Sequence, residues 1–395
     1  MFFAEIILWL SIFCIFYPFV VYPILLKIIS LFVKTEILTS DNFEPNITIV
    51  ISAYNEEENI QNAIISVFND GYPKEKLSIL VGIDGKTDNT DQKIEELQKI
   101  HSNINYHIFK HSGKNGVLNQ LIPLVKTDYY IIMDADLRFN NASNSISKII
   151  NLFYDSSVGN VITSLRLIDA NVANESSPFY NDFETKSEGF GENIYQKFET
   201  FLKEKESNIK STVNALGIIA CRKEDYVSIP NNKICDDFFR LLQTALIGKR
   251  VIYQRDITVN EISKKSVSTE LKRRERMVSG ALATMWHLKK LLLPTSGIVS
   301  FFLFSHKLIR YFMPFFLILV FASTFFISND SVKIIFLVAQ MLFYLLAIIG
   351  IIFEKQASKI LLIKIISFFV IMNYGFLKGI FRFISGKQNS SWTRN

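Results

Sequence analysis

The sequence predicts an α/β domain, built on a mainly parallel sheet, that is attached to membrane-spanning helices. Long uncharged segments lie near both ends of the chain, and between them short β-branched runs alternate with segments of helical periodicity. The 395 residues are 49% hydrophobic and only 20% charged, whereas a soluble protein usually carries about 25% charged residues. The composition therefore favours a protein that lies partly in lipid.

The net charge and the cysteines exclude several other classes of protein. A net charge of +6 is too small to suggest a nucleic-acid partner, although it suits a protein beside an anionic membrane surface. Three cysteines cannot form a disulfide framework, and their odd number fits a reducing compartment. The five histidines show no metal-ligand spacing, and we interpret them as ordinary surface or core residues: His101, His107, His111, His287 and His306.

Three uncharged segments are long enough to cross a membrane as helices, namely residues 6–26, 311–329 and 334–353. The first lies where a secretory signal would lie, but it is long and has no basic residues before it. Lys27 and Lys34 follow it, and such a basic flank predicts that the chain after residue 30 is cytoplasmic. We therefore expect an N-terminal anchor over residues 1–34.

Two further hydrophobic segments are ambiguous. Residues 291–305 are too short to span easily and predict a helix in the membrane interface. Residues 360–383 contain three basic side chains and could span or be re-entrant; spanning is favoured, although it places the basic tail outside. We expect residues 286–395 to hold both segments, within a C-terminal transmembrane region, and residues 43–285 to form a cytoplasmic globular domain.

Alternating strands and helices are expected in this globular domain. The predicted strands cover residues 47–51, 77–83, 105–109 and 129–133. The predicted helices begin at Asn55 and cover residues 90–100 and 115–125. Polar residues follow three of the strands: Tyr54, Asp84, Asp134 and Asp136. Ligands of such sheets bind beyond the carboxyl ends of the strands, so these residues are the first candidates for a site.

Asp134 and Asp136 stand two residues apart at the end of an apolar strand. Two such carboxylates can share Mg²⁺ or a similar cation, which also binds the phosphates of a substrate. The D-x-D pattern arises by chance, and a solvated loop is its ordinary alternative. Because a strand precedes it and no glycine-rich phosphate loop competes elsewhere, the pattern favours a site for a cation and a diphosphate.

Several further segments carry a recognisable pattern in the same order along the chain. They are residues 46–59, Asp84–Thr90, Gly113-Lys114 with Leu118-Asn119, residues 129–136, Asp236-Asp237 with residues 248–251, and Arg273–Arg276. Tyr195 with Glu199, Gly217 with Arg222, Ser305–Lys307 and Gly386 with Trp392 and Arg394 add to them. Together these motifs resemble the inverting family 2 glycosyltransferases of the GT-A fold. Ser305–Lys307 and Gly386 with Trp392 and Arg394 resemble membrane-bound members in particular.

The resemblance implies a GT-A fold, with a mixed, mainly parallel sheet flanked by helices, and a nucleotide-sugar donor. Tyr54 and Glu56 would line the nucleotide base, and Asp84 would hydrogen-bond the edge of the base. Lys114 would neutralise the diphosphate. The ordinary alternatives are turn and N-cap roles for Glu56 and Asp84 and a solvated lysine at position 114.

The resemblance assigns the remaining site residues to the reaction itself. Asp134 would face the ribose or diphosphate and share with Asp136 a divalent cation, Mg²⁺ or Mn²⁺. Arg276 would clamp the leaving diphosphate, unless it only belongs to a basic helix face. Asp237 would be the catalytic base; the pair Asp236-Asp237 precedes a helical periodicity, so capping of that helix is its alternative.

Three departures from the family pattern matter. Lys86 replaces a serine, and Asp236-Asp237 replaces the usual glutamate–aspartate pair, which leaves the base slightly open. Processive polysaccharide synthases carry Q-x-x-R-W, whereas this chain has Arg273 at the glutamine position and Met277 at the tryptophan position. We therefore expect one or a few sugars to be added to each acceptor.

The sequence thus predicts a membrane-anchored inverting glycosyltransferase. It would move a sugar from a UDP-linked donor to a lipid-linked or polysaccharide acceptor in cell-surface glycan synthesis, at the cytoplasmic face of the inner (plasma) membrane. The alternative is a protein without catalysis, either a polysaccharide transport component or a nucleotide-sugar-binding membrane scaffold. Lipid and glycan are the expected partners, and nucleic acid is not.

Overall fold

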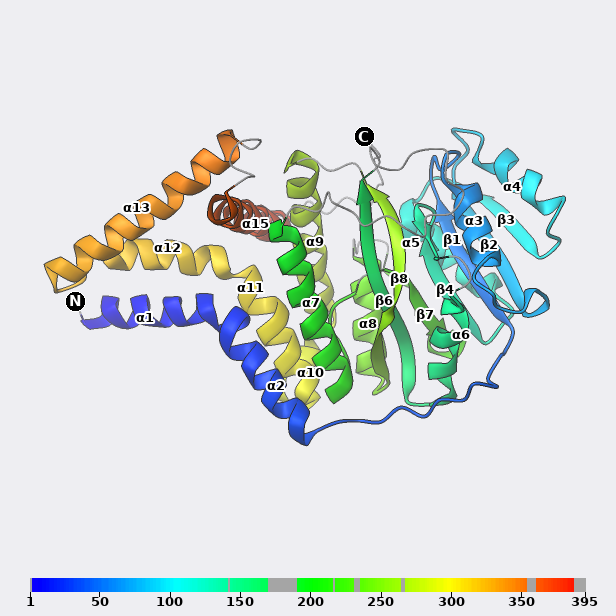
Figure 1. Ribbon diagram of the computed structural model, residues 1–395, viewed down its shortest axis with the longest axis horizontal. Helices are drawn as coiled ribbons and strands as arrows, with labels where there is room; N and C mark the ends of the chain where they lie inside the picture. The colour runs from blue at the N-terminus through cyan, green and yellow to red at the C-terminus, as the bar shows by residue number, and fades with distance from the viewer. Residues whose placement is uncertain are drawn as a thin grey trace. The chain divides into compact units, whose positions relative to one another are not determined.

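The computed structural model of the chain consists of two compact units, an α/β unit and a helical unit (Figure 1). The structure describes residues 2–140, 143–169, 190–215, 217–230, 235–263, 267–353 and 360–386. The α/β unit comprises the described residues within 33–186 and 203–265, and the helical unit those within 1–32, 187–202 and 266–387. The terminal motif residues Trp392 and Arg394 lie outside the described residues.

The α/β unit is built on a sheet of eight described strands in the order β3-β2-β1-β4-β7-β6-β8-β5. Their bounds are β1 Ile47–Ala53, β2 Leu77–Asp84, β3 Ile104–Phe109, β4 Tyr129–Asp134, β5 Leu137–Arg138, β6 Val158–Asp169, β7 Ile219–Arg222 and β8 Arg250–Ser263. The first four strands are parallel, and β7 then runs antiparallel to both β4 and β6. This arrangement confirms the mixed α/β sheet and the four strands that the sequence predicts.

Both faces of the sheet are covered by helices (Figure 1). The helices of the α/β unit are α3 Ile60–Phe68, α4 Thr90–Gln98, α5 Gly113–Leu121, α6 Ser145–Ile150 and α8 Asp236–Leu246. Alternate residues of β1 enter two separate cores: Ile49 and Ile51 pack in the core that includes α3 and α6, and Val50 packs in the core that includes α5. Burial on both faces explains why this strand is an unbroken β-branched run.

One helix begins later than the sequence predicts. We expected a helix from Asn55, but α3 begins at Ile60. Asn55 has a positive φ of 55°, and the N–H of Glu56 donates to Thr90 Oγ1 at 3.0 Å. The N–H of Glu57 donates to Asp88 Oδ2 at 3.1 Å. The acidic run therefore forms a turn against the loop after β2, and these tertiary hydrogen bonds outweigh its helical preference.

The helical unit contains three helices, among the described residues, that are long and apolar enough to cross a membrane. They are residues 3–32, α13 Asp330–Ile352 and α15 Leu361–Ile384. The remaining described elements are α1 Phe2–Phe16 and α2 Tyr22–Phe32 within the first of these, α9 Val267–His287, α10 Ile298–Phe302, α11 Ile309–Tyr311 and α12 Met313–Thr324. Helix α7, Phe190–Ile209, contributes residues to both units.

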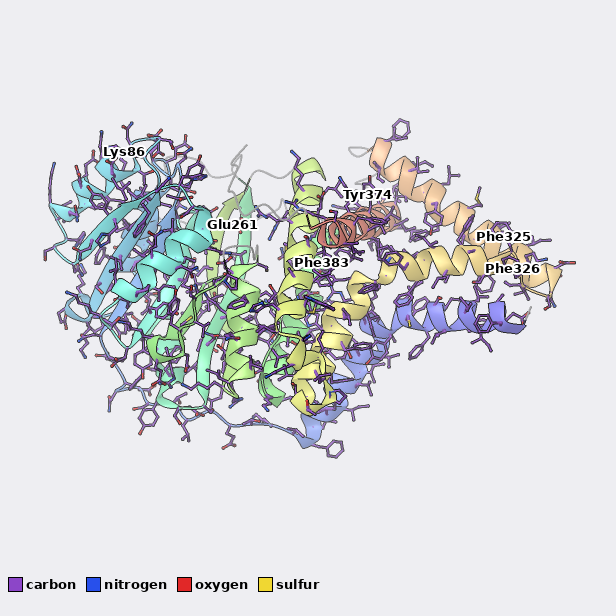
Figure 2. All side chains as sticks on the ribbon, turned by 180° about the vertical axis from the view of Figure 1, so that it is seen from behind. Lys86, Glu261, Phe325, Phe326, Tyr374 and Phe383 are labelled. Carbon is purple, nitrogen blue, oxygen red and sulfur yellow. The ribbon has the colours of Figure 1, made fainter. Side chains whose placement is uncertain are left out.

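The span expected at residues 311–329 and the interfacial helix expected at 291–305 form one bent element instead. Residues 298–311 and α12 are together long and apolar enough to cross a membrane, and the two helices are bent by 57° at Phe312. Pro314 follows the bend, and proline lacks the N–H that would continue the preceding helix. Phe325 and Phe326, just after α12, are exposed, as suits residues in contact with lipid (Figure 2).

Two of the basic side chains that made the last hydrophobic segment ambiguous are paired within the helical unit. Lys378 and Arg382 of α15 each lie 3.4 Å from the carboxylate of Glu275 on α9. The helices can approach closely because Gly379 has no side chain. A Cβ at this position would lie 2.7 Å from Val278 Cβ. This pairing lowers the cost of placing α15 among apolar helices.

A buried polar cluster joins two of the sequence motifs in the helical unit. Glu199 accepts from Arg310 Nη1 at 2.5 Å and contacts His306 Nε2 at 3.0 Å. Arg310 Nη2 also donates to the hydroxyl of Tyr195 at 2.5 Å. The motif of α7 and the Ser305–Lys307 motif are therefore one structural feature, because Glu199 of the first contacts His306 of the second.

A glycine on β2 sets the position of α5. A Cβ at Gly82 would lie 2.5 Å from Val117 Cγ1 and 3.0 Å from Leu121 Cδ2, both on α5. We predict that Gly82→Ala lowers the free energy of unfolding by about 1–3 kcal/mol, because the added methyl group overpacks this contact. The measurement is thermal unfolding of the detergent-solubilised chain.

The double variant Gly82→Ala with Val117→Ala provides the control. It removes the side chain that the new methyl group would meet, so its loss of stability should be smaller than the sum of the two single losses. Additive losses would contradict a direct contact between position 82 and α5.

Candidate active site

The centre of the site is the ammonium group of Lys114, which lies among three aspartates. Its Nζ is 2.7 Å from Asp134 Oδ1, 3.2 Å from Asp236 Oδ2 and 4.0 Å from Asp237 Oδ1. The lysine side chain is only 14% exposed. Burial alone would lower the pKa of Lys114, but the three carboxylates raise it well above its usual value. Lys114 is therefore a permanent cation at this position.

Three elements that are distant in the sequence bring these groups together. Lys114 is the second residue of α5, Asp134 ends β4, and Asp236 begins α8. Strand β4 pairs with the central strand β1, where Asp134 lies opposite Ser52. The start of α8 at Asp236 confirms the helix start predicted there. The structure therefore brings together Lys114, Asp134 and the acidic pair, as expected for residues at the carboxyl edge of the sheet.

The two carboxyl groups of the pair titrate differently. Burial opposes ionisation of Asp236, but Lys114 and Arg240 hold its pKa below the usual value. Burial and the charge of Asp236 raise the pKa of Asp237 to about 8. The Asp237 side chain is also the more accessible, at 37% exposed against 10% for Asp236. The pair therefore contains one fixed anion and one group that can exchange a proton near neutral pH.

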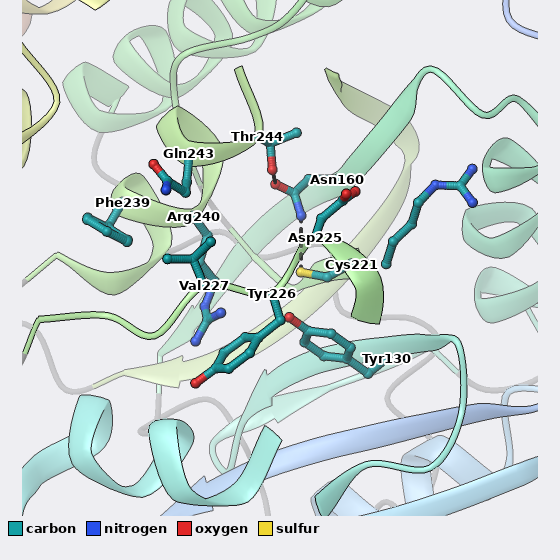
Figure 3. Close-up of a pocket in the computed structure, with 11 residues that line it drawn as sticks. Tyr130, Asn160, Cys221, Asp225, Tyr226, Val227, Phe239, Arg240, Gln243 and Thr244 are labelled. Carbon is teal, nitrogen blue, oxygen red and sulfur yellow. Dashed lines mark hydrogen bonds between the residues drawn. The ribbon is translucent and has the colours of Figure 1, made fainter. Parts of the chain in front are cut away.

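Arg240 lies one turn of α8 after Asp236 and is buried. Its guanidinium lies 5.8 Å from the ring of Tyr226, and neither Nε nor Nη2 has a hydrogen-bond partner among the described residues (Figure 3). The adjoining cavity of about 20 Å³ has room for roughly one water molecule. This pocket is too small for a substrate, so Arg240 acts on the site through its charge.

Asp136 belongs to a second acidic cluster. Burial, together with the charges of Asp134, Glu261 and Glu56, raises the pKa of Asp136 to about 7. Glu261 is on β8 (Figure 2) and reaches the site because its strand pairs with β5, where Leu137 lies opposite it. Glu261 could not be recognised from the sequence, because nothing near it in the chain signals a site.

The residues present fit a divalent cation that is also bound by a phosphate-bearing ligand. Apart from Lys114 Nζ at 2.7 Å, Asp134 Oδ1 has no hydrogen-bond donor among the described residues. The crowded carboxylates around Asp136 would be stabilised by a positive charge. Within the described chain, however, no three His, Cys, Asp or Glu side chains are arranged as a ready metal site. The fit is therefore to a cation held by few carboxylates, as is common for Mg²⁺.

The predicted nucleotide-binding residues lie at the ends of β1 and β2. The Asp84 side chain is 1% exposed, and it accepts the N–H groups of Ser112 and Gly113 at 2.6 and 2.9 Å. His111 Nδ1 lies 3.0 Å from Asp84 Oδ2, and the His111 ring lies 4.9 Å from the ring of Tyr54. His111, which the sequence analysis interpreted as an ordinary histidine, is therefore part of this group of residues.

Two other predicted residues lie elsewhere. Glu56 is buried, and its Oε2 accepts from Asn59 Nδ2 at 2.9 Å. Its charge acts on Asp136, so it belongs to the acidic cluster as well as to the turn after β1. Arg276 is an exposed residue of α9 in the helical unit. The base contact of Glu56 and the diphosphate contact of Arg276 stay predictions.

The departure at Lys86 has a structural explanation. Lys86 Nζ lies 2.5 Å from Asp91 Oδ2, at the start of α4. In the same loop, Asp88 Oδ1 accepts from the N–H of Thr90 at 3.0 Å. Lys86, which stands where the family has a serine, therefore forms an ion pair with the first turn of α4. Asp88, in the same loop, binds the backbone at the start of this helix.

The family model described as "Glycosyl transferase family 2" matches residues 48–226. A dolichyl N-acetyl-α-D-glucosaminyl phosphate 3-β-D-2,3-diacetamido-2,3-dideoxy-β-D-glucuronosyltransferase of Methanococcus voltae is 39% identical over 92 residues, 22% of this chain and 28% of that protein. A poly-β-1,6-N-acetyl-D-glucosamine synthase of Staphylococcus epidermidis is 32% identical over 90 residues, 23% of this chain and 21% of that protein. The matches thus span less than a third of these relatives.

A solved structure resembles the chain over much more of its length. The mannosyltransferase PcManGT from Pyrobaculum calidifontis, in complex with GDP-Man and Mn²⁺, has a TM-score of 0.71 and 16% sequence identity. The likeness covers 96% of this chain and 99% of that one, and it supports the GT-A fold. The family match and the curated relatives thus support a family 2 glycosyltransferase domain over residues 48–226, and the solved structure supports its fold.

Proposed function

We propose that the chain transfers a sugar, with inversion, from a UDP-linked donor to a lipid-linked or polysaccharide acceptor. The observation that supports this most is the position of Lys114, which lies between the end of the D-x-D strand and the acidic pair of α8. This arrangement offers a cation to the diphosphate of a donor beside a carboxyl group that can accept a proton. The relatives' names, which include a polysaccharide synthase and a dolichyl-phosphate sugar transferase, support the acceptor class.

On the donor side, Asp134 and Asp136 would hold Mg²⁺ or Mn²⁺, with Glu261 and Glu56 as charged neighbours. The cation, when bound, supplies positive charge to the donor diphosphate. Lys114 adds a fixed positive charge 2.7 Å from Asp134 Oδ1 and keeps that carboxylate in place. We assign Arg276 to the departing diphosphate, because a planar guanidinium pairs well with phosphate oxygens.

On the acceptor side, Asp237 takes the proton from the attacking hydroxyl group. The acceptor oxygen forms a bond to the anomeric carbon while the bond from that carbon to the diphosphate oxygen breaks, and the electron pair leaves with the diphosphate. Asp236 stays ionised between Lys114 and Arg240, so the proton goes to Asp237. One carboxylate is sufficient, because the leaving diphosphate needs no protein acid.

We also propose that the α/β unit faces the cytoplasm of a plasma membrane. Lys27 lies near the C-terminal end of the first apolar helix and Lys34 follows that helix, where the chain continues into this unit, which is the positive-inside pattern. Ile100, 73% exposed on the α/β unit, offers a reporter position. An Ile100→Cys variant should react with a membrane-impermeant maleimide only after the cells are permeabilised, above the background of the wild type. Equal labelling of intact cells would reverse the proposed orientation.

The cation proposal is tested at Asp136. Asp136→Asn should weaken Mn²⁺-dependent binding of the donor and reduce turnover by at least about a hundredfold, because the amide removes an anionic ligand. Nucleotide release from a panel of UDP-sugars and GDP-mannose measures turnover, and EDTA should abolish it in the wild type. Asp155→Asn, outside the site, serves as the matched control. Full activity in EDTA would contradict the proposal.

The proposed base is tested at Asp237. Asp237→Asn should lower turnover by about 10²–10⁴-fold while donor binding changes little, because the amide cannot accept the proton. Asp236→Asn is the matched neighbour and should disturb Lys114 and donor binding as well. If Asp236→Asn abolishes turnover while Asp237→Asn stays active, the base is the other residue.

The pH dependence gives a second measurement of the same group. Asp237 accepts a proton only when it is ionised, and its pKa of about 8 lies above its usual value. The kcat/KM of the wild type should therefore rise with pH, reach half of its maximum near pH 8 and level off above that pH. A rate that is constant from pH 5 to pH 9 would exclude this carboxyl group as the base, and the absence of any nucleotide release would favour a non-catalytic protein.

A further inference from the structure

His111 lies at the carboxyl edge of the sheet with one ring nitrogen engaged and the other open. It follows β3 and precedes α5, and its side chain is 44% exposed. Nδ1 lies 3.0 Å from Asp84 Oδ2, whereas Nε2 has no hydrogen-bond partner among the described residues. The ring is tilted by 37° against the ring of Tyr54, at 4.9 Å between centroids. An exposed aromatic pair with an open polar atom is suited to a flat, polar ligand.

Asp84 determines which nitrogen of His111 carries the proton. Its two oxygens accept the N–H groups of Ser112 and Gly113, at 2.6 and 2.9 Å, so the carboxylate acts as an acceptor throughout. Facing an acceptor, Nδ1 of the neutral ring carries the hydrogen, and Nε2 is left as an acceptor. With its side chain 1% exposed, Asp84 offers a ligand almost no surface of its own.

We infer that His111, oriented by Asp84 and packed against the ring of Tyr54, contacts the base of the nucleotide donor through Nε2. This inference rests on the proposed function and extends it to the chemistry of the base. An acceptor at Nε2 suits a base that presents a ring N–H, such as N3–H of uracil or N1–H of guanine. The role expected for Asp84 is thereby divided: the buried carboxylate fixes the tautomer, and the exposed imidazole meets the ligand.

The inference is tested by nucleotides that differ in that single hydrogen. Binding of UDP and N3-methyl-UDP, and of GDP and N1-methyl-GDP, is measured by calorimetry on the full-length protein in detergent with Mn²⁺. For the base that binds, the wild type should prefer the unmethylated nucleotide by about tenfold or more, since one hydrogen bond and its geometry are lost on methylation.

Three substitutions separate hydrogen bonding from stacking. His111→Phe keeps an aromatic ring and should lose most of the preference, while raising the KM of the donor more than it lowers kcat. His111→Gln reaches the position of Nε2 with an amide oxygen and should keep part of the preference. His111→Asn reaches only the position of Nδ1 and should lose it. Agreement of the Gln and Asn variants would contradict an acceptor at Nε2.

His101→Phe is the matched control, because His101 also stacks on an aromatic ring but lies before β3, at the opposite end of the strand. It should leave both affinities and the preference unchanged. If His111→Phe keeps the wild-type preference, or if the wild type binds methylated and unmethylated nucleotides equally, the inference is overturned while nucleotide binding stands. If the wild type binds no nucleoside diphosphate, the proposed function fails as well.

Discussion

The buried ammonium group of Lys114 is the interaction on which the rest of the site depends. Three carboxylates from two other elements converge within 4.0 Å of it. Without this cation, Asp236 would be a buried anion beside the half-buried Asp134, and like charges raise one another's pKa. The position of Lys114 depends in turn on α5, which approaches β2 closely only because residue 82 is a glycine. A packing constraint inside the α/β unit therefore sets the electrostatics at its edge.

The distribution of charge around Lys114 gives neighbouring carboxyl groups different properties. Asp236 has two cations beside it, Lys114 and Arg240, and its pKa is lowered despite burial. Asp237 is one residue further along and has a raised pKa, because it is buried and has the anion of Asp236 as its neighbour. Adjacent residues of the same type thus become a fixed anion and a proton acceptor, and the difference arises only from their surroundings.

Buried charges are satisfied differently in the helical unit. Glu199 lies between Arg310 and His306, and Glu275 lies between two basic residues of α15. These groups pair within the unit, and the hydrophobic helices around them remain otherwise apolar. In the α/β unit, by contrast, three carboxylates share the single ammonium group of Lys114, and Asp136 lies near Asp134, Glu261 and Glu56. Crowded carboxylates of this kind are expected where a bound cation adds positive charge, and the contrast sets the candidate site apart.

Local signals in the sequence were sufficient for the first four strands and for the candidate residues at their ends. The β-branched runs predicted strands β1 to β4, because a strand buried on both faces must be apolar throughout. The polar residues directly after those strands had to share one edge of a parallel sheet, so Tyr54, Asp84 and Asp134 could be placed near one another. The start of α8 at Asp236 followed from the periodicity after it.

Only the tertiary structure decided the features that depend on contacts between distant segments. The turn at Asn55 replaced a predicted helix because Asp88 and Thr90 bind its backbone from another loop. Glu261 joined the acidic cluster through strand pairing, and His111 became part of the nucleotide end through Asp84. A sequence pattern shows which residues can take part in a site. Their partners, and hence their protonation and accessibility, are fixed by side chains far away in the chain.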